Sequence, residues 1–197
     1  ANDDEAITNE DTPIVINNLL ANDYDVDTDA LTITDFSPPA NGVMERQAND
    51  TFAYTPNLNF SGGDSFSYTI SDGNEGTASA TVRITVISIN DAPVAQAGQD
   101  REVFVGDLVT LDGSGSADVD TNVLNFSWMF TAVPQDSRAA LSDSTTEKPT
   151  FVPDVDGTYE IQLIVNDEEF DSPPDQVVIT VNLRMVDVPN VVELSHA

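Results

Sequence analysis

Short stretches of the chain alternate strictly between apolar and polar residues. In residues 77–86, TASATVRITV, the apolar side chains occupy every second position from Ala78 to Val86. A period of two indicates a β-strand with one buried face. The same alternation recurs in four further stretches, residues 65–70, 123–130, 158–165 and 176–181. Turn-forming segments such as SPPANG, SDGNEG and DSPPD separate them, and no stretch keeps a helical period over three turns, so the pattern predicts an all-β protein.

The pattern also repeats along the chain. The acidic motif DVDT occurs at Asp25–Thr28 and again at Asp118–Thr121, 93 residues further on. The strand ends ISD, at residues 70–72, and VND, at residues 165–167, lie 95 residues apart. This period suits one immunoglobulin-like sandwich. We therefore predict two tandem immunoglobulin-like antiparallel β-sandwich domains, residues 1–91 and 92–183, followed by a tail or the start of a further module at residues 184–197.

The charge of the chain narrows the range of partners. Asp and Glu number 35 against 6 Lys and Arg, which gives a formal net charge of −29. Nucleic acids and anionic membranes need basic patches, so neither is expected as a partner, whereas cations are. The absence of cysteine excludes disulfides, thiolate metal sites and a Cys nucleophile. No apolar run of about 18 residues is present, so direct membrane insertion is not expected.

The repeated acids are candidate ligands for calcium, which takes about six to eight oxygen ligands. An extended Asp-x-Asp places both carboxylates on one side of the chain. In a sandwich, the loops that carry DVDT and the later Asp emerge at the same end. We predict one site in the second domain that includes the linker, formed by Asn90, Asp91, Asp118, Asp120 and Asp167. The same reasoning predicts a site in the first domain, formed by Asp25, Asp27 and Asp72.

Other interpretations of these residues stay open. A single Asp in a loop commonly caps its own turn by accepting backbone hydrogen bonds. Trp128 is expected in the core of its strand, and the alternative is an exposed platform for a sugar ring. Tyr24, within the first acidic loop, is the better candidate for an exposed aromatic side chain.

Several longer segments resemble known families. NEDTPIVI, LLANDYDVDTDALTI, YTPNLNFSGGDSFSYTISDG and the closing NDAP resemble the cadherin-like tandem repeat domains of large bacterial surface proteins, over residues 1–92. VTLDGSGSADVD, LNFSW and PTFVPDVDGTYEIQLIVND resemble PKD (polycystic kidney disease) domains, over residues 93–182. The tail VPNVVELSHA is similar to the opening of a PASTA-type repeat, except that Glu193 stands where such repeats usually have Gly.

These resemblances imply a function. Both main families are immunoglobulin-like sandwiches that occur in extracellular arrays. The cadherin resemblance adds Glu10 to the interdomain site, as the acid supplied by the preceding domain. It also implies that the site of Asp25, Asp27 and Asp72 is weaker or empty without a preceding module. The expected protein is a Ca²⁺-binding, calcium-rigidified spacer or adhesion module of a larger bacterial surface or secreted protein, with calcium and neighbouring modules of the same chain as partners.

Two other functional classes are weighed against this one. The first is an accessory module of an exported enzyme that binds a polysaccharide or a cell-surface protein, since PKD and cadherin-like domains accompany such enzymes. The second is an enzyme, which the sequence argues against. It has no cysteine, its single histidine is His196 in the tail, and it shows no Gly-rich phosphate loop between a strand and a helix.

Overall fold

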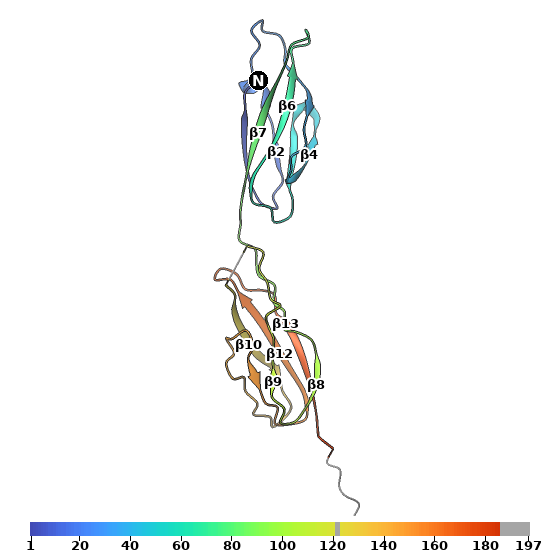
Figure 1. Ribbon diagram of the computed structural model, residues 1–197, viewed down its shortest axis with the longest axis vertical. Helices are drawn as coiled ribbons and strands as arrows, with labels where there is room; N and C mark the ends of the chain where they lie inside the picture. Colours follow the sequence, from blue (N-terminus) through green and yellow to red (C-terminus); the bar gives the residue numbers. More distant parts are fainter. Residues whose placement is uncertain (121–122, 186–197) are drawn as a thin grey trace, which may run out of the picture. The chain divides into compact units, whose positions relative to one another are not determined.

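The computed structural model describes residues 1–120 and 123–185 and divides into two compact units (Figure 1). The first unit comprises Ala1–Ile89, and the second begins at Asn90. Both are β-sandwiches, which confirms the predicted all-β, immunoglobulin-like fold class. The helical segments of the described residues are two short 3₁₀ turns, η1 (Leu19–Asn22) and η2 (Ala48–Asp50). From residue 186 on, the predicted tail lies outside the described residues.

The first unit packs a four-stranded sheet against a three-stranded sheet. The four-stranded sheet has the order β1 (Asp4–Asn9), β7 (Thr77–Ile87), β6 (Gly62–Ser71) and β3 (Thr32–Phe36). The other has the order β2 (Ile14–Ile16), β5 (Phe52–Pro56) and β4 (Gly42–Arg46). The buried core between them includes Phe52, Tyr54, Phe66, Tyr68 and Val82.

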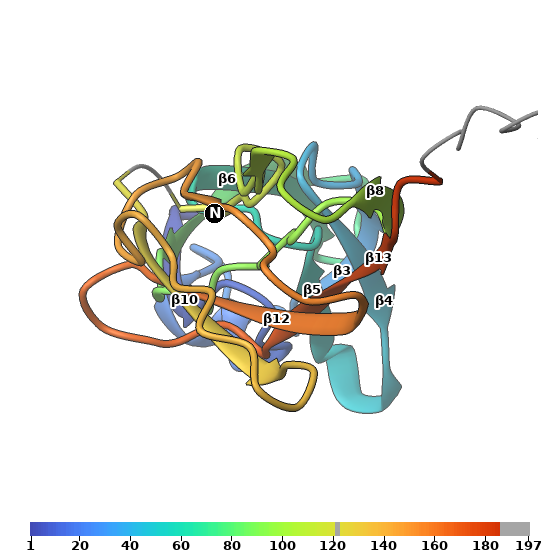
Figure 2. The ribbon, with the colours of Figure 1, turned by 90° about the horizontal axis from the view of Figure 1, so that it is seen from below.

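The second unit has a four-stranded and a two-stranded sheet. The larger sheet has the order β10 (Asn125–Ala132), β12 (Gly157–Asn166), β13 (Asp175–Asn182) and β8 (Arg101–Phe104). The smaller pairs β11 (Thr150–Phe151) with β9 (Val109–Thr110). Figure 2 shows the antiparallel neighbours β10 and β12 side by side. Trp128 is 2% exposed and its Nε1 donates to Thr146 O at 3.1 Å, which confirms the prediction that it belongs to the core.

One strand pair in each unit departs from the antiparallel expectation. β1 runs parallel to β7, with Ala6 opposite Ile84, and β8 runs parallel to β13, with Val103 opposite Val181. The first and last strands of each sandwich therefore point the same way. As a result, the chain enters a unit at one end and leaves it at the other, which suits modules joined in series.

The alternation of apolar residues correctly identifies the buried faces, with one exception. Phe66, Tyr68 and Ile70 of β6 are buried, as is every second residue of β7 from Ala80 to Val86. Ala78, at the start of β7, is in phase with them but exposed. The strand begins there at the open end of the sandwich, beside a pocket.

Candidate functional site

The structure brings together the five predicted site residues of the second unit. Asp118 and Asp120 lie in the loop between β9 and β10, Asp167 directly follows β12, and Asn90 and Asp91 begin the unit. Asp91 N donates to Asp120 Oδ2 at 2.7 Å, and Asn90 Nδ2 donates to Asp167 Oδ2 at 2.7 Å. The linker residues are thus tied to both acidic loops. These five residues are called the acidic cluster below.

Two carboxylates of the acidic cluster also cap turns. Asp118 Oδ1 accepts a hydrogen bond from Asp120 N at 2.8 Å. Asp167 Oδ1 accepts from the backbone N–H groups of Glu169 and Phe170, at 2.7 and 2.6 Å. The Phe170 N–H, followed by the Asn90 side chain, holds the pKa of Asp167 below its ordinary value against the opposing effect of burial. Asp167 therefore stays ionised well below neutral pH.

The chemistry of the acidic cluster suits a hard cation, although it does not form a ready-made cage. The Oδ2 atoms of Asp91 and Asp118 are shielded from solvent. The side chains of the acidic cluster carry carboxylate oxygens and one amide oxygen, which are ligand types that calcium prefers. Within residues 1–120 and 123–185, no group of three or more His, Asp or Glu side chains is arranged to hold a metal ion. In this geometry the carboxylates face backbone and amide N–H groups instead.

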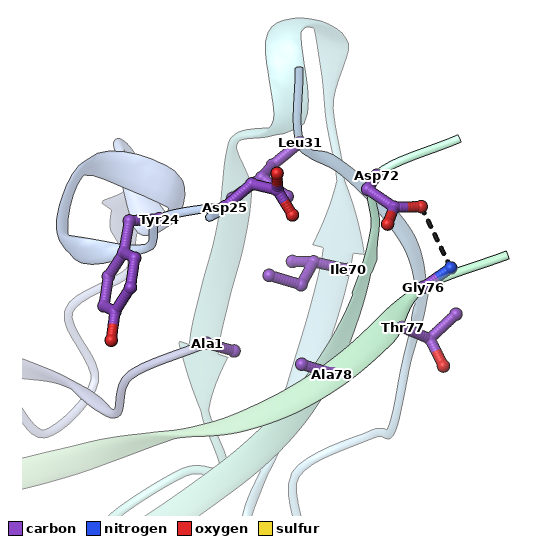
Figure 3. A pocket seen from close by; sticks show the side chains of 9 residues that line it. All are labelled: Ala1, Tyr24, Asp25, Leu31, Ile70, Asp72, Gly76, Thr77 and Ala78. Atoms are coloured by element: carbon purple, nitrogen blue, oxygen red, sulfur yellow. Dashed lines mark hydrogen bonds between the residues drawn. The ribbon is translucent and has the colours of Figure 1, made fainter. Parts of the chain in front are cut away.

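The first unit repeats the same capping pattern. Asp25 Oδ1 accepts from Asp27 N at 2.8 Å, and Asp72 Oδ1 accepts from Gly76 N at 3.0 Å. Asp25 and Asp72 line one open pocket of about 180 Å³, shown in Figure 3 with the hydrogen bond from Gly76 to Asp72. Asp27 is exposed and is not among the lining residues. The structure therefore brings two of the three predicted residues together at this pocket.

Glu10, which the cadherin resemblance adds to the interdomain site, is buried in the first unit. Its side chain is 6% exposed. Its Oε1 accepts a hydrogen bond from Ile89 N at 2.6 Å, and its own N–H donates to Ile87 O at 2.9 Å. Glu10 thus fastens the end of β1 to the last residues of the first unit. Its participation in a calcium site stays a prediction.

Glu10→Ala is expected to destabilise the first unit by about 1–3 kcal/mol, because the Ile89 N–H loses its acceptor in a partly buried place. Glu10→Gln keeps a side-chain oxygen as acceptor and should destabilise the first unit less than Glu10→Ala. Urea denaturation followed by unit-specific NMR signals measures both. Equal stabilities of the Ala variant and the wild type would show that this hydrogen bond contributes nothing.

Sequence reasoning missed a buried carboxylate in the first unit. Asp64 is 9% exposed and accepts from Tyr54 Oη at 2.9 Å, Ala40 N at 3.1 Å and Asn41 N at 3.0 Å. It anchors the turn before β4 to β6. A signal was present in the sequence, because Asp64 is in phase with the buried face of its strand two residues before Phe66.

A second acidic group surrounds Tyr68. The Tyr68 hydroxyl lies 2.9 Å from Asp4 Oδ2 and 3.1 Å from Asp23 Oδ2. Burial raises the pKa of Asp4, the hydrogen bond from Tyr68 opposes that rise, and the charge of Asp23 adds to it. Burial and the two carboxylates also raise the pKa of Tyr68, so its hydroxyl remains a donor.

The raised pKa of Asp4 predicts a pH-dependent stability difference. Between the unfolded value of about 3.9 and the raised folded value, the native state binds more protons than the unfolded state. The wild type is therefore expected to lose stability as the pH rises through this window. Asp4→Asn should be more stable than the wild type at pH 7, with the difference shrinking below about pH 4. Thermal melts across this range test it, and a difference that does not change with pH would contradict it.

Comparison with known proteins assigns a type to each unit. Residues 1–85 match the family model for the bacterial Ig domain, and residues 97–181 match that for the K319L-like PKD domain. Each match covers less than half of the chain and describes one unit. The predicted resemblance to a bacterial module of cadherin-like fold followed by a PKD domain is confirmed.

Individual proteins are similar to this chain over part of their length or in fold alone. The protein GAMETE EXPRESSED 2 of Arabidopsis thaliana is 46% identical over 71 residues, which are 36% of this chain and 8% of that protein, so the chain spans a small part of this relative. Cadherin domains 3–6 of Protocadherin Gamma B2 match 94% of this chain and 46% of theirs, at 11% identity and a TM-score of 0.53, which shows the fold alone. The PKD domain of the KIAA 1837 protein is 29% identical over 51% of this chain and 97% of its own, with a TM-score of 0.42.

The chain therefore consists of two immunoglobulin-like units in tandem, of which the first is similar to a bacterial Ig domain and the second to a PKD domain. Modules of these kinds are typically extracellular and non-catalytic, and they are common in adhesion and spacer proteins. The described residues contain no helix long and apolar enough to cross a membrane.

Proposed function

We propose that this chain is a calcium-binding spacer module of a larger bacterial surface or secreted protein, in which calcium stiffens the junction between the two units. One observation carries the proposal. The first residues of the second unit, Asn90 and Asp91, are hydrogen-bonded to Asp167 and Asp120, at the ends of two acidic loops.

The acidic cluster offers the ligands that calcium needs. Asp91, Asp118, Asp120 and Asp167 supply four carboxylates, and Asn90 supplies a side-chain amide whose oxygen can be turned inward by a rotation about its last bond. Asp118 caps its turn with one carboxylate oxygen, Oδ1, and its other oxygen, Oδ2, is shielded from solvent. Bound calcium supplies positive charge that offsets the repulsion among these carboxylates. Extracellular calcium modules bind in the range of about 10⁻⁴–10⁻³ M.

The position of these ligands in the chain connects binding to stiffness. Ile89 is the last residue of the first unit, and Asn90 follows it directly. Units of one chain move relative to each other by default. Ligands supplied by Asn90 and Asp91 would restrict the backbone torsions of the junction. The same-direction first and last strands of each sandwich further support a module built for a linear array.

Small-angle scattering tests the spacer mechanism. We expect a larger and better-defined maximum dimension in calcium than in chelator. Asp118→Asn with Asp120→Asn should abolish the difference, because both side chains lose their charge but keep an oxygen that can cap the turn. The charge-matched control, Asp136→Asn with Glu147→Gln, changes two exposed acids of the second unit outside the acidic cluster. This control should still show the difference in maximum dimension between calcium and chelator. Superimposable wild-type curves in calcium and chelator would overturn the spacer mechanism.

A further inference from the structure

The pocket of the first unit combines an apolar floor with two carboxylates (Figure 3). Its floor includes Ile70 and Ala78, which are cross-strand neighbours on β6 and β7, together with Leu31. Figure 3 shows Asp25 and Asp72 above this floor and the ring of Tyr24 to one side.

The two carboxylates are anchored by hydrogen bonds, and the pocket lining beside them includes the N-terminal residue Ala1. Asp25 and Asp72 each use Oδ1 to accept backbone hydrogen bonds, from Asp27 and Gly76 among others. The salt bridges of the described residues involve other acids, and neither Asp25 nor Asp72 belongs to one. The pocket therefore places two negative charges above an apolar surface.

The lining suits an organic cation better than a metal ion. Calcium requires about six to eight oxygen ligands, whereas the side chains here offer two carboxylates and the Thr77 hydroxyl beside apolar groups. An alkylammonium group would contact both the apolar floor and the carboxylates, since long amines pack their methylenes against apolar atoms and keep the charge near polar ones. Tyr24 is 77% exposed, so its ring is free to contact a cation through its face.

The size of the pocket fits this ligand. The pocket has a volume of about 180 Å³, which suits a single side chain such as the four-carbon stem and ammonium group of lysine. The net charge of −29 also raises the local concentration of basic ligands.

We propose that this pocket binds an alkylammonium group, presented by a lysine side chain of a partner protein. The inference goes beyond the proposed function and is independent of it, because no residue of the acidic cluster takes part.

An NMR titration of the whole chain with Nα-acetyl-lysine methylamide tests the proposal. We expect saturable shifts of the Asp72, Gly76, Thr77 and Ala78 amides, with a dissociation constant on the order of 1–10 mM, as suits a small and solvent-exposed ligand. The uncharged norleucine analogue should bind at least tenfold more weakly. Cadaverine serves as the free-amine arm, and a preference for the lysine derivative supports a partner protein as the source.

Variants separate the pocket from general charge attraction. Asp25→Asn with Asp72→Asn should weaken lysine binding at least tenfold, and Tyr24→Ala a few-fold, while Asp136→Asn should leave it unchanged. If the NMR spectrum of the double variant loses the dispersion of a folded protein, the single variant Asp25→Asn replaces it in this test. Equal binding of lysine and norleucine derivatives would overturn the proposal. So would calcium shifting the same amides and displacing the lysine derivative at submillimolar concentration.

Discussion

Replacing chelator by about 10 mM calcium is expected to raise the thermal midpoint of the second unit by roughly 5–20 °C. This concentration is about ten to a hundred times the affinity range of extracellular calcium modules. A ligand that binds only the native state then contributes about 1.4–2.7 kcal/mol, and about 1 kcal/mol shifts the midpoint of a domain of this size by roughly 4–8 °C. Scanning calorimetry in calcium and in chelator measures the shift.

Magnesium provides the first control for this experiment. It prefers a rigid octahedron and keeps several waters, so loop carboxylates should bind it more weakly. The Asp118→Asn, Asp120→Asn variant should lose the calcium response and remain folded, because neither side chain belongs to the apolar core. An unchanged midpoint in calcium, or an equal rise in magnesium, would contradict the proposed site.

Asp64→Ala is expected to destabilise the first unit by about 3 kcal/mol or more. The substitution leaves the Tyr54 hydroxyl and the N–H groups of Ala40 and Asn41 without their acceptor. Each buried donor left without a partner costs about 1–3 kcal/mol. Burial and the neighbouring Asp64 raise the pKa of Tyr54, so the hydroxyl remains protonated and in need of an acceptor.

Urea denaturation of the first unit checks this prediction. Tyr54→Phe is the matched control, because it removes one donor and keeps the ring, and it should cost about 1 kcal/mol. A loss below 1 kcal/mol for Asp64→Ala would show that water replaces the carboxylate at little cost.

The sequence predicts the strands well because their pattern is a property of backbone geometry. Successive side chains of a strand point to opposite faces, so the apolar positions of β6 and β12 directly identify the faces that the core buries. The 93-residue recurrence of DVDT likewise corresponds to loops with the same local bonding, since Asp25 and Asp118 both accept from the N–H two residues later, at 2.8 Å.

Contacts between distant segments could not be predicted in this way. The burial of Glu10 depends on Ile89, which is 79 residues away. The sharing of the Tyr68 hydroxyl by Asp4 and Asp23 depends on the parallel pairing of β1 with β7, which places the start of the chain beside the core. Asp64 differs from both, because a carboxylate in phase with Phe66 and Tyr68 already indicates a buried partner.

The most direct test of the account is a residue-resolved calcium titration followed by ¹H–¹⁵N NMR. The N–H groups of Asp91 and Asp120 donate to carboxylates of the acidic cluster, so calcium binding there should change their chemical environment first. We predict saturable shifts at Asp91, Asp120, Glu169 and Phe170 that disappear in the Asp118→Asn, Asp120→Asn variant. If these amides do not respond to calcium, or respond equally in the variant, the acidic cluster is a set of turn caps and the calcium-spacer account is wrong.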